Sequence, residues 1–144
     1  MNVYLAFTVR GNREALNAAR ALSQVIQRHH HTVITTHLLA DDVDAAEDAL
    51  SEREVFERDM RWLESADLLI AEASGSSYGV GFEVGYVLGR SRETKQRVLL
   101  LFDAARRPSI SRLIPGAAHA RCTVREYADV EGAARIVEDY LRDG

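Results

Sequence analysis

Short apolar runs alternate with helical patterns along the whole chain, and this alternation constrains the fold more than any other feature. Five segments have the composition of β-strands, namely residues 3–8, 32–39, 68–73, 97–102 and 122–126. Between them, apolar residues recur at helical spacing, as in residues 16–26. Strands that alternate with helices form a parallel sheet covered on both faces. We therefore predict one α/β domain over residues 1–144, Rossmann-like or flavodoxin-like, with about five parallel strands.

Several helix boundaries are also predicted. Ser51 and Glu54 form an S-x-x-E capping box, so a helix should begin there and end near Ala66. The acidic stretch 41–48 is expected to be a loop or a solvated helix, and further helices are predicted over residues 80–90 and 130–141. Residues 29–31 are three consecutive histidines at a helix end, and because such residues do not share a helical face, they argue against a metal site.

Composition limits the partners and the compartment. The formal net charge is −4, so no global positive field attracts nucleic acid or an acidic membrane. Cys122 is the only cysteine, which excludes an internal disulfide, and in a strand it is more often a small hydrophobe than a nucleophile. Residues 1–8 have the pattern of a first strand, not of a signal peptide. A soluble cytoplasmic protein is expected, and any anionic ligand needs a local site.

Ligands of parallel α/β sheets bind beyond the carboxyl ends of the strands, at the switch point in strand order. This rule selects residues 8–13, 38–42 and 74–83. The last of these, SGSSYGVGFE, leaves an apolar strand, crosses a Gly/Ser loop and enters a helix. Backbone N–H groups and the helix dipole suit such a turn to an anion, although plain turns with this composition are about as common.

Two carboxylates fall on faces that should be packed. Glu83 shares a helical face with Val80 and Val87, where the helix N-terminus should favour its ionised form, as a glycosidic nucleophile requires. Asp59 lies on an apolar stripe of the preceding helix, where burial would raise its pKa and suit it to a general acid. A dipole-complementing Glu and a loop-capping Asp are the alternatives. Taken together, the pair suggests cleavage of a glycosidic bond.

Other polar groups fall at the same edge. Thr8, Arg10 and the backbone of Gly11 follow the first strand and are natural phosphate partners, unless they form a solvated basic turn. His37, at the end of the second strand, either faces the crevice or is a satisfied core histidine. One helix face, suited to close packing against the sheet or a partner subunit, carries Gly81, Gly85 and Gly89.

Three blocks of sequence resemble the 2'-deoxynucleoside 5'-phosphate N-hydrolases of the nucleoside 2-deoxyribosyltransferase superfamily. VYLAFTVRG, residues 3–11, resembles the family's first strand and phosphate loop. ERDMRWLESADLLIAEASGSSYGVGFE, residues 57–83, resembles its catalytic core. SRLIPGA, residues 111–117, resembles the segment that a second subunit lends to the phosphate site.

The resemblance implies specific roles. Glu83 would attack C1' to form a phospho-deoxyribosyl enzyme, Asp59 would assist departure of the base and activate water, and Tyr4 would pack near the sugar and the nucleophile. Ser111 would come from the partner chain of a homodimer that needs no metal or organic cofactor. The remaining positions implied to hold the nucleotide or its loop are Thr8, Val9, Arg10, Gly11, Ser77, Gly79 and Gly81.

The chain departs from the family pattern at two positions. Phe7 stands where the family usually has glycine beside the ligand, and Thr8 replaces a serine but keeps the hydroxyl. Retention of Tyr4 and the small Val9 favours a deoxynucleotide over a ribonucleotide such as CMP. Three alternatives to the hydrolase remain open: a deoxyribosyltransferase, a ribonucleotide N-glycosidase of the CMP type, and a nucleotide-binding module without catalysis.

Overall fold

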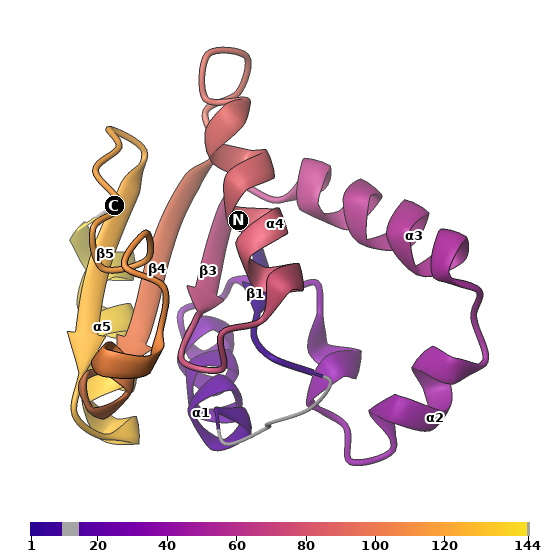
Figure 1. The fold of residues 1–144 in the computed structure, drawn as a ribbon, viewed down its shortest axis with the longest axis horizontal. Helices are drawn as coiled ribbons and strands as arrows, with labels where there is room; N and C mark the ends of the chain where they lie inside the picture. Colours follow the sequence, from indigo (N-terminus) through magenta and orange to yellow (C-terminus); the bar gives the residue numbers. More distant parts are fainter. Residues whose placement is uncertain (10–14, 144) are drawn as a thin grey trace.

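The computed structural model describes residues 1–9 and 15–143. Its centre is one parallel sheet in the order β2-β1-β3-β4-β5, which confirms the predicted α/β fold (Figure 1). The strands are β1 (Asn2–Ala6), β2 (Thr32–Val33), β3 (Leu68–Glu72), β4 (Arg97–Asp103) and β5 (Cys122–Tyr127). The helices are α1 (Leu16–Arg28), α2 (Val43–Asp48), α3 (Glu52–Ser65), α4 (Tyr78–Gly89) and α5 (Val130–Asp143), with 3-10 turns η1 (Thr36–Leu39) and η2 (Ala104–Ser109).

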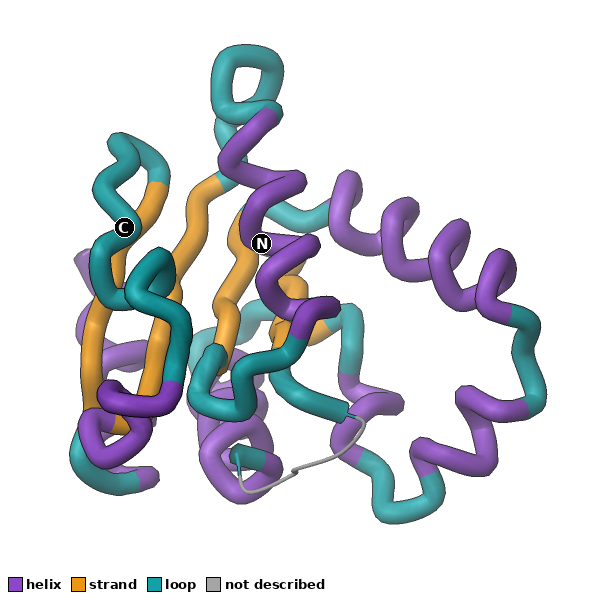
Figure 2. The backbone as a smooth tube through the Cα atoms, in the orientation of Figure 1, coloured by secondary structure: helices purple, strands orange, loops and turns teal. Residues whose placement is uncertain are grey.

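Helices cover both faces of the sheet, and the alternation along β1 explains why. Val3 and Leu5 point into one core, which contains the buried residues of α1 and α5. Tyr4 and Ala6 point into the other, which contains Leu63 of α3 and the buried face of α4. In Figures 1 and 2, α4 accordingly lies in front of the sheet, with α1 and α5 behind it. Among the described residues, no helix is long and apolar enough to cross a membrane.

The second strand is much shorter than the sequence indicates. We predicted a strand over residues 32–39, but β2 pairs with β1 only at Thr32 and Val33. Beyond them, the side chain of Thr35 takes over the role of the strand backbone. Its Oγ1 accepts from the N–H of Leu5 (3.1 Å) and donates to the Leu5 carbonyl (2.8 Å), so the chain is free to turn into η1. His37 therefore lies in a 3-10 turn and not at a strand end.

The predicted helix boundaries agree closely with the structure. The capping box of Ser51 and Glu54 is present, and α3 ends at Ser65. The acidic stretch forms α2, and α1 ends at Arg28 just before the three histidines. The helix predicted from residue 80 begins two residues earlier, at Tyr78, because the Ser77 side chain caps it by accepting from the N–H of Val80 (3.4 Å).

The strand order sets the place of the ligand crevice. From β1 the chain crosses to β2 on one side of the sheet and then returns to add β3 on the other side of β1. The switch point therefore lies between β1 and β3. The segments that follow these two strands, residues 7–9 and 73–77, meet at this edge, as do η1 and the first turn of α4 (Figure 1).

Candidate active site

A cavity of about 310 Å³ lies at the carboxyl ends of β1 and β3, where the switch-point rule places a ligand. It combines the segment after β1 with residues of η1, α2, α3 and α4. The residues that line it are Ala6, Phe7, Val9, Leu38, Glu47, Val55, Asp59, Ser77, Gly79, Val80 and Glu83. The structure thus brings together both carboxylates that the sequence singled out, along with Val9, Ser77 and Gly79, and we call this cavity the crevice.

Glu83 is held by Tyr4 inside the crevice. The buried Tyr4 hydroxyl donates to Glu83 Oε1 over 2.6 Å. Burial raises the pKa of Glu83 to about 7, although the Tyr4 hydrogen bond lowers it and the nearby Asp59 raises it further. Burial and the negative charge of Glu83 also raise the pKa of Tyr4, so Tyr4 stays a neutral donor. We expect the helix N-terminus to favour the ionised form, and burial of the carboxyl acts in the opposite direction.

Asp59 is an ion-paired carboxylate at the edge of the core. Its side chain is 27% exposed, and Oδ1 accepts from Arg58 Nε over 2.8 Å. We had expected an Asp enclosed by its apolar stripe, but α3 buries Leu63 and leaves Phe56 55% exposed. The stripe therefore turns partly toward solvent. Asp59 faces the crevice with a cation beside it, which suits a carboxylate that handles protons at the ligand.

Arg58 is the centre of a network that sequence reasoning missed. Its guanidinium binds both oxygens of Glu47, with Nη1 to Oε1 at 2.7 Å and Nη2 to Oε2 at 3.1 Å. It also lies 4.8 Å from the ring centroid of Trp62, a cation–π distance. Glu47 comes from α2 and Arg58 from α3, so only the tertiary packing reveals their pairing. The one signal in the sequence is that Arg58 precedes Asp59.

His37 lies beside this network. Its ring packs on Trp62 with centroids 4.9 Å apart, and its Nε2 lies 3.6 Å from Glu47 Oε1. Burial lowers the pKa of His37, and the neighbouring Arg58 lowers it further. Nε2 is buried without a hydrogen-bond partner among the described residues. The structure therefore places His37 behind the crevice wall that Glu47 forms, as a largely neutral ring.

The loop after β3 approaches Thr8 very closely. A Cβ added to Gly75 would lie 2.0 Å from Thr8 Oγ1, so only glycine fits at this position. The Thr8 hydroxyl is buried and has no hydrogen-bond partner in the part of the chain that the structure describes. An unsatisfied buried hydroxyl against Gly75, two residues before the capping Ser77, fits the donor set of an anion site. Arg10 and Gly11, predicted to contact phosphate, lie outside the described residues.

The same loop is anchored from below by a buried glutamate. Glu72 ends β3 with no exposed surface and accepts from the Tyr127 hydroxyl (2.8 Å) and from both the N–H and hydroxyl of Ser74. Ser74 Oγ in turn accepts from the N–H of Asp103 (2.7 Å). The carboxyl ends of β3, β4 and β5 are thereby tied together. Glu72 was hidden in a run that we predicted to be almost wholly apolar, and it gives the loop a rigid base.

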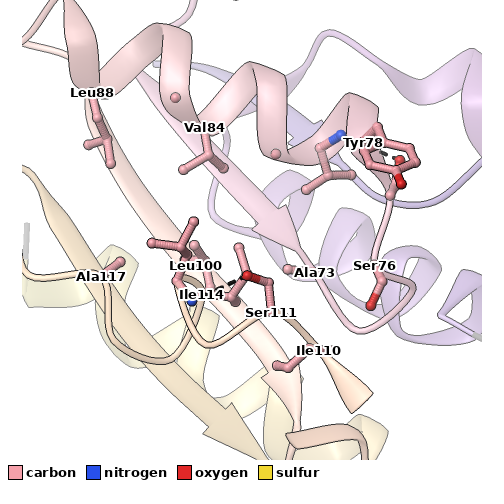
Figure 3. Close-up of a pocket in the computed structure, with 15 residues that line it drawn as sticks. Ala73, Ser76, Tyr78, Val84, Leu88, Leu100, Ile110, Ser111, Ile114 and Ala117 are labelled. Carbon is pink, nitrogen blue, oxygen red and sulfur yellow. Dashed lines mark hydrogen bonds between the residues drawn. The ribbon is translucent and has the colours of Figure 1, made fainter.

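Ser111 and Gly81 lie in a different cavity of the same chain. A groove of about 490 Å³ runs between α4 and residues 110–117, and both residues line it (Figure 3). Figure 3 shows Val84 and Leu88 of α4 directed toward the segment that carries Ser111 and Ile114. Ser77 lines the groove as well as the crevice, so the two cavities adjoin at the start of α4. Within one chain, Ser111 does not enter the crevice.

The glycines of α4 mark an open helix face. Gly81, Gly85 and Gly89 are exposed, and a Cβ added to any of them would meet nothing within 4 Å. Of the two predicted packing partners for this face, the sheet is therefore excluded. In the described part of the chain, no three His, Cys, Asp or Glu side chains come close enough together to hold a metal ion.

Comparison with known proteins agrees with this geometry. The sequence profile of the nucleoside 2-deoxyribosyltransferase family matches residues 3–128. A protein of Thermofilum pendens that bears the name 2'-deoxynucleoside 5'-phosphate N-hydrolase 1 is 40% identical over 98% of this chain and 95% of its own length. The 5-hydroxymethyl-dUMP N-hydrolase of Homo sapiens is 33% identical over 93% of this chain and 76% of its own length.

A solved structure shares the fold at low sequence identity. The CMP N-glycosidase of Clostridium botulinum superposes with a TM-score of 0.72 at 15% identity, covering 97% of this chain and 99% of the other. That likeness concerns the architecture alone. The sequence matches extend through the strand, loop and helix that carry Tyr4 and Glu83, and they confirm the resemblance found in the three sequence blocks. The chain belongs to the nucleoside 2-deoxyribosyltransferase family.

Proposed function

We propose that the protein hydrolyses the N-glycosidic bond of 2'-deoxynucleoside 5'-monophosphates, giving free base and 2-deoxyribose 5-phosphate. The observation that carries the proposal is the placement of Glu83. It lies in the crevice at the sheet's switch point, hydrogen-bonded by the Tyr4 hydroxyl, with Asp59 lining the same cavity. Relatives of 30–40% identity named as N-hydrolases of deoxynucleotides support the same activity.

The reaction proceeds in two steps. In the first, a Glu83 oxygen bonds to C1' while the C1'–N bond breaks, and the base keeps the electron pair and takes a proton that reaches it by way of Asp59. In the second, water attacks C1', its proton passes to Asp59, and the bond to Glu83 breaks. One water is consumed in all, its hydroxyl going to C1' and its hydrogen to the base. Tyr4 holds the Glu83 carboxylate at the reacting face throughout.

The 5'-phosphate binds at the loop between β3 and α4. Three features support this position: the capped N-terminus of α4, the hydroxyl of Ser77 in the crevice wall, and the unpaired buried hydroxyl of Thr8. The family resemblance adds Arg10 and the backbone of Gly11 to these donors. It also adds Ser111, from the second subunit of a homodimer.

The homodimer forms through the open face of α4. Tyr78 is 98% exposed, Phe82 54% and Leu113 82%, and the groove beside them is lined mostly by apolar side chains. Exposed apolar surface of this kind marks an interaction site in a soluble protein. Because the groove adjoins the crevice at Ser77, a partner seated there brings residues 110–117 near a phosphate. We place the whole chain in one domain and in the cytoplasm.

The decisive experiment is chromatographic detection of free base. The panel pairs deoxynucleoside monophosphates with the matching deoxynucleosides and ribonucleoside monophosphates, each with and without an acceptor base. Release from deoxynucleotides without an acceptor is expected. Release only from unphosphorylated nucleosides with an acceptor would instead establish a transferase. Release only from ribonucleotides would establish a CMP-type glycosidase, and no release at all would favour a binding module.

Two variants test the assignments within the site. Glu83→Ala should abolish turnover, whereas Glu93→Ala, an exposed glutamate beyond the end of α4, should retain it. Turnover by Glu83→Ala at the wild-type rate would remove Glu83 as the nucleophile. Leu113→Glu should convert the dimer to a monomer in analytical ultracentrifugation and raise KM for the nucleotide. A dimer that survives this change would exclude the α4 groove as the interface.

A further inference from the structure

Glu47 is a carboxylate of the crevice wall that the proposed chemistry does not use. It comes from α2, is 9% exposed and lines the crevice together with Asp59 and Glu83. Among the described residues, Arg58 binds both of its oxygens, and His37 Nε2 lies 3.6 Å from Oε1. A nearly buried carboxylate at a ligand cavity needs either full internal pairing or a ligand that completes its hydrogen bonds.

Arg58 fixes the spacing between Glu47 and Asp59. One guanidinium binds both carboxylates: Nη1 and Nη2 bind Glu47, and Nε donates to Asp59 Oδ1, which also lies 2.8 Å from Nη2. Its side chain is only 14% exposed and packs over the face of Trp62, so the fork has little freedom to rotate. Glu47 and Asp59 therefore line the same crevice with one guanidinium bound between them.

This spacing places Glu47 at the edge of the base, an argument that rests on the proposed function. A nucleophile attacks C1' from the face opposite the leaving group, so the base departs on the side away from Glu83. Asp59 assists that departure and must adjoin the base. Glu47, the next carboxylate along the wall, then meets the far edge of the base, while Leu38 and Val55 supply apolar contacts to it.

The ionised carboxylate of Glu47 can only accept hydrogen bonds, which determines the kind of base it can bind. Each carboxylate oxygen has two lone pairs and no proton to donate, and Arg58 engages one direction at each oxygen. A base with an exocyclic N–H or O–H group can satisfy the remaining lone pairs. A carbonyl oxygen at the same position would face a like partial charge with no donor between them. The crevice wall thus distinguishes bases by whether they present a hydrogen-bond donor or an acceptor. Proteins discriminate more sharply between such groups than between groups that differ only in size.

We propose that Glu47, held by Arg58, is the residue that selects the base, and that it favours deoxynucleotides whose base carries an exocyclic hydrogen-bond donor. Two kinds of base present such a donor: those with an amino group, as in cytosine, and those with a hydroxymethyl group on the ring. Two substrate pairs distinguish these sources. dCMP and dUMP differ at the 4-amino group, and 5-hydroxymethyl-dUMP and dTMP differ at one hydroxyl.

The test compares kcat/KM within each pair for wild type, Glu47→Gln and Glu52→Gln. Glu52 is exposed and lines a shallow surface groove next to Glu47, outside the crevice, so its substitution is a matched control for charge. Wild type should prefer the donor-bearing member of at least one pair by about tenfold or more. Glu47→Gln should reduce that preference about tenfold, because the amide can donate to a carbonyl. Glu52→Gln should keep the preference of wild type.

Selectivity is the informative quantity, because Glu47→Gln also loosens Arg58 and lowers all rates together. Ratios unchanged within about twofold in both pairs would overturn the assignment while leaving the hydrolase intact. Binding provides a readout independent of turnover. In calorimetry on a Glu83→Gln background, Glu47→Gln should weaken binding of the donor-bearing nucleotide more than binding of the other nucleotide in the pair. Equal weakening of binding for both nucleotides would also overturn the proposal. If wild type released no base, the proposed function would fail, and this binding comparison would still decide the role of Glu47.

Discussion

Replacement of Tyr4 by Phe isolates the hydrogen bond that controls Glu83. The variant removes one hydroxyl, whose 2.6 Å bond to Glu83 Oε1 favours the ionised carboxylate. A hydrogen bond to a charged group contributes about 1.5–3 kcal/mol, which corresponds to about 1–2 pKa units. The pKa of Glu83 should therefore rise from about 7 to about 8–9. At pH 7 the ionised fraction would fall from about one half to about 1–10%.

The assay is the pH profile of kcat/KM for base release. Wild type should lose activity as the pH falls below about 7, since the nucleophile is then protonated. Tyr4→Phe should lose about 5–50-fold at pH 7, and its acid limb should shift upward by about 1–2 units, so that much of the loss is recovered at pH 9. Tyr86→Phe, which removes a hydroxyl bonded to Glu64 on the outer side of α4, should leave the profile unchanged. A Tyr4→Phe profile that falls in height without shifting would refute this reasoning.

Three further predictions concern stability and the loop. The pKa of Glu83 is raised from 4.5 in the unfolded chain to about 7, so the free energy of unfolding should fall as the pH rises through that interval, by up to about 3 kcal/mol. Glu83→Gln should therefore raise Tm at pH 8 and leave it nearly unchanged at pH 4; equal effects at both pH values would contradict this. Gly75→Ala should lower Tm and raise KM for the nucleotide, because its Cβ would overlap Thr8, and Thr8→Ala in the same chain should restore part of the Tm by removing the overlapping atoms. Arg58→Met should cost about 1–3 kcal/mol of stability in chemical denaturation, since it leaves Glu47 without its cation, whereas Arg53→Met in an exposed pair should cost less than about 0.5 kcal/mol.

The fold could be predicted because the spacing of apolar residues within each segment indicates which side chains are buried. Residues 68–73 are apolar apart from Glu72, a pattern that favours a central strand covered on both faces, and β3 occupies that place. The second strand was predicted too long because Thr35 bonds to the backbone of Leu5 through its side chain, an arrangement that has the same β-branched composition as a strand. Local composition cannot distinguish a strand backbone from a threonine side chain as the hydrogen-bond partner of the Leu5 N–H and C=O groups.

The site could be predicted only in part, for a related reason. Glu83 and Asp59 were found because a carboxylate on a packed helical face stands out in the sequence. Glu47 was missed because it lies in an acidic run that looks solvated, and its burial depends on Arg58 from the next helix. The raised pKa of Glu83 could not be predicted in the same way, because a helix N-terminus is visible in a sequence, whereas the desolvation that raises the pKa is created by tertiary packing.

Glu47, Asp59 and Glu83, the three carboxylates of the crevice, differ in their hydrogen-bond partners. This difference fits the different role proposed for each of them. Glu47 and Asp59 share the positive charge of Arg58, whereas Glu83 accepts a hydrogen bond from the neutral Tyr4 hydroxyl. A carboxylate tied to a cation loses nucleophilicity, because its lone pairs are engaged and its charge is compensated. Glu83 keeps a full negative charge when ionised, yet desolvation makes that charge costly in the crevice. In the proposed reaction, bond formation at C1' removes this cost, so the burial that raises the pKa of Glu83 would also favour the covalent intermediate. The positive charge of Arg58 meanwhile partly offsets the repulsion from Asp59 that raises the pKa of Glu83.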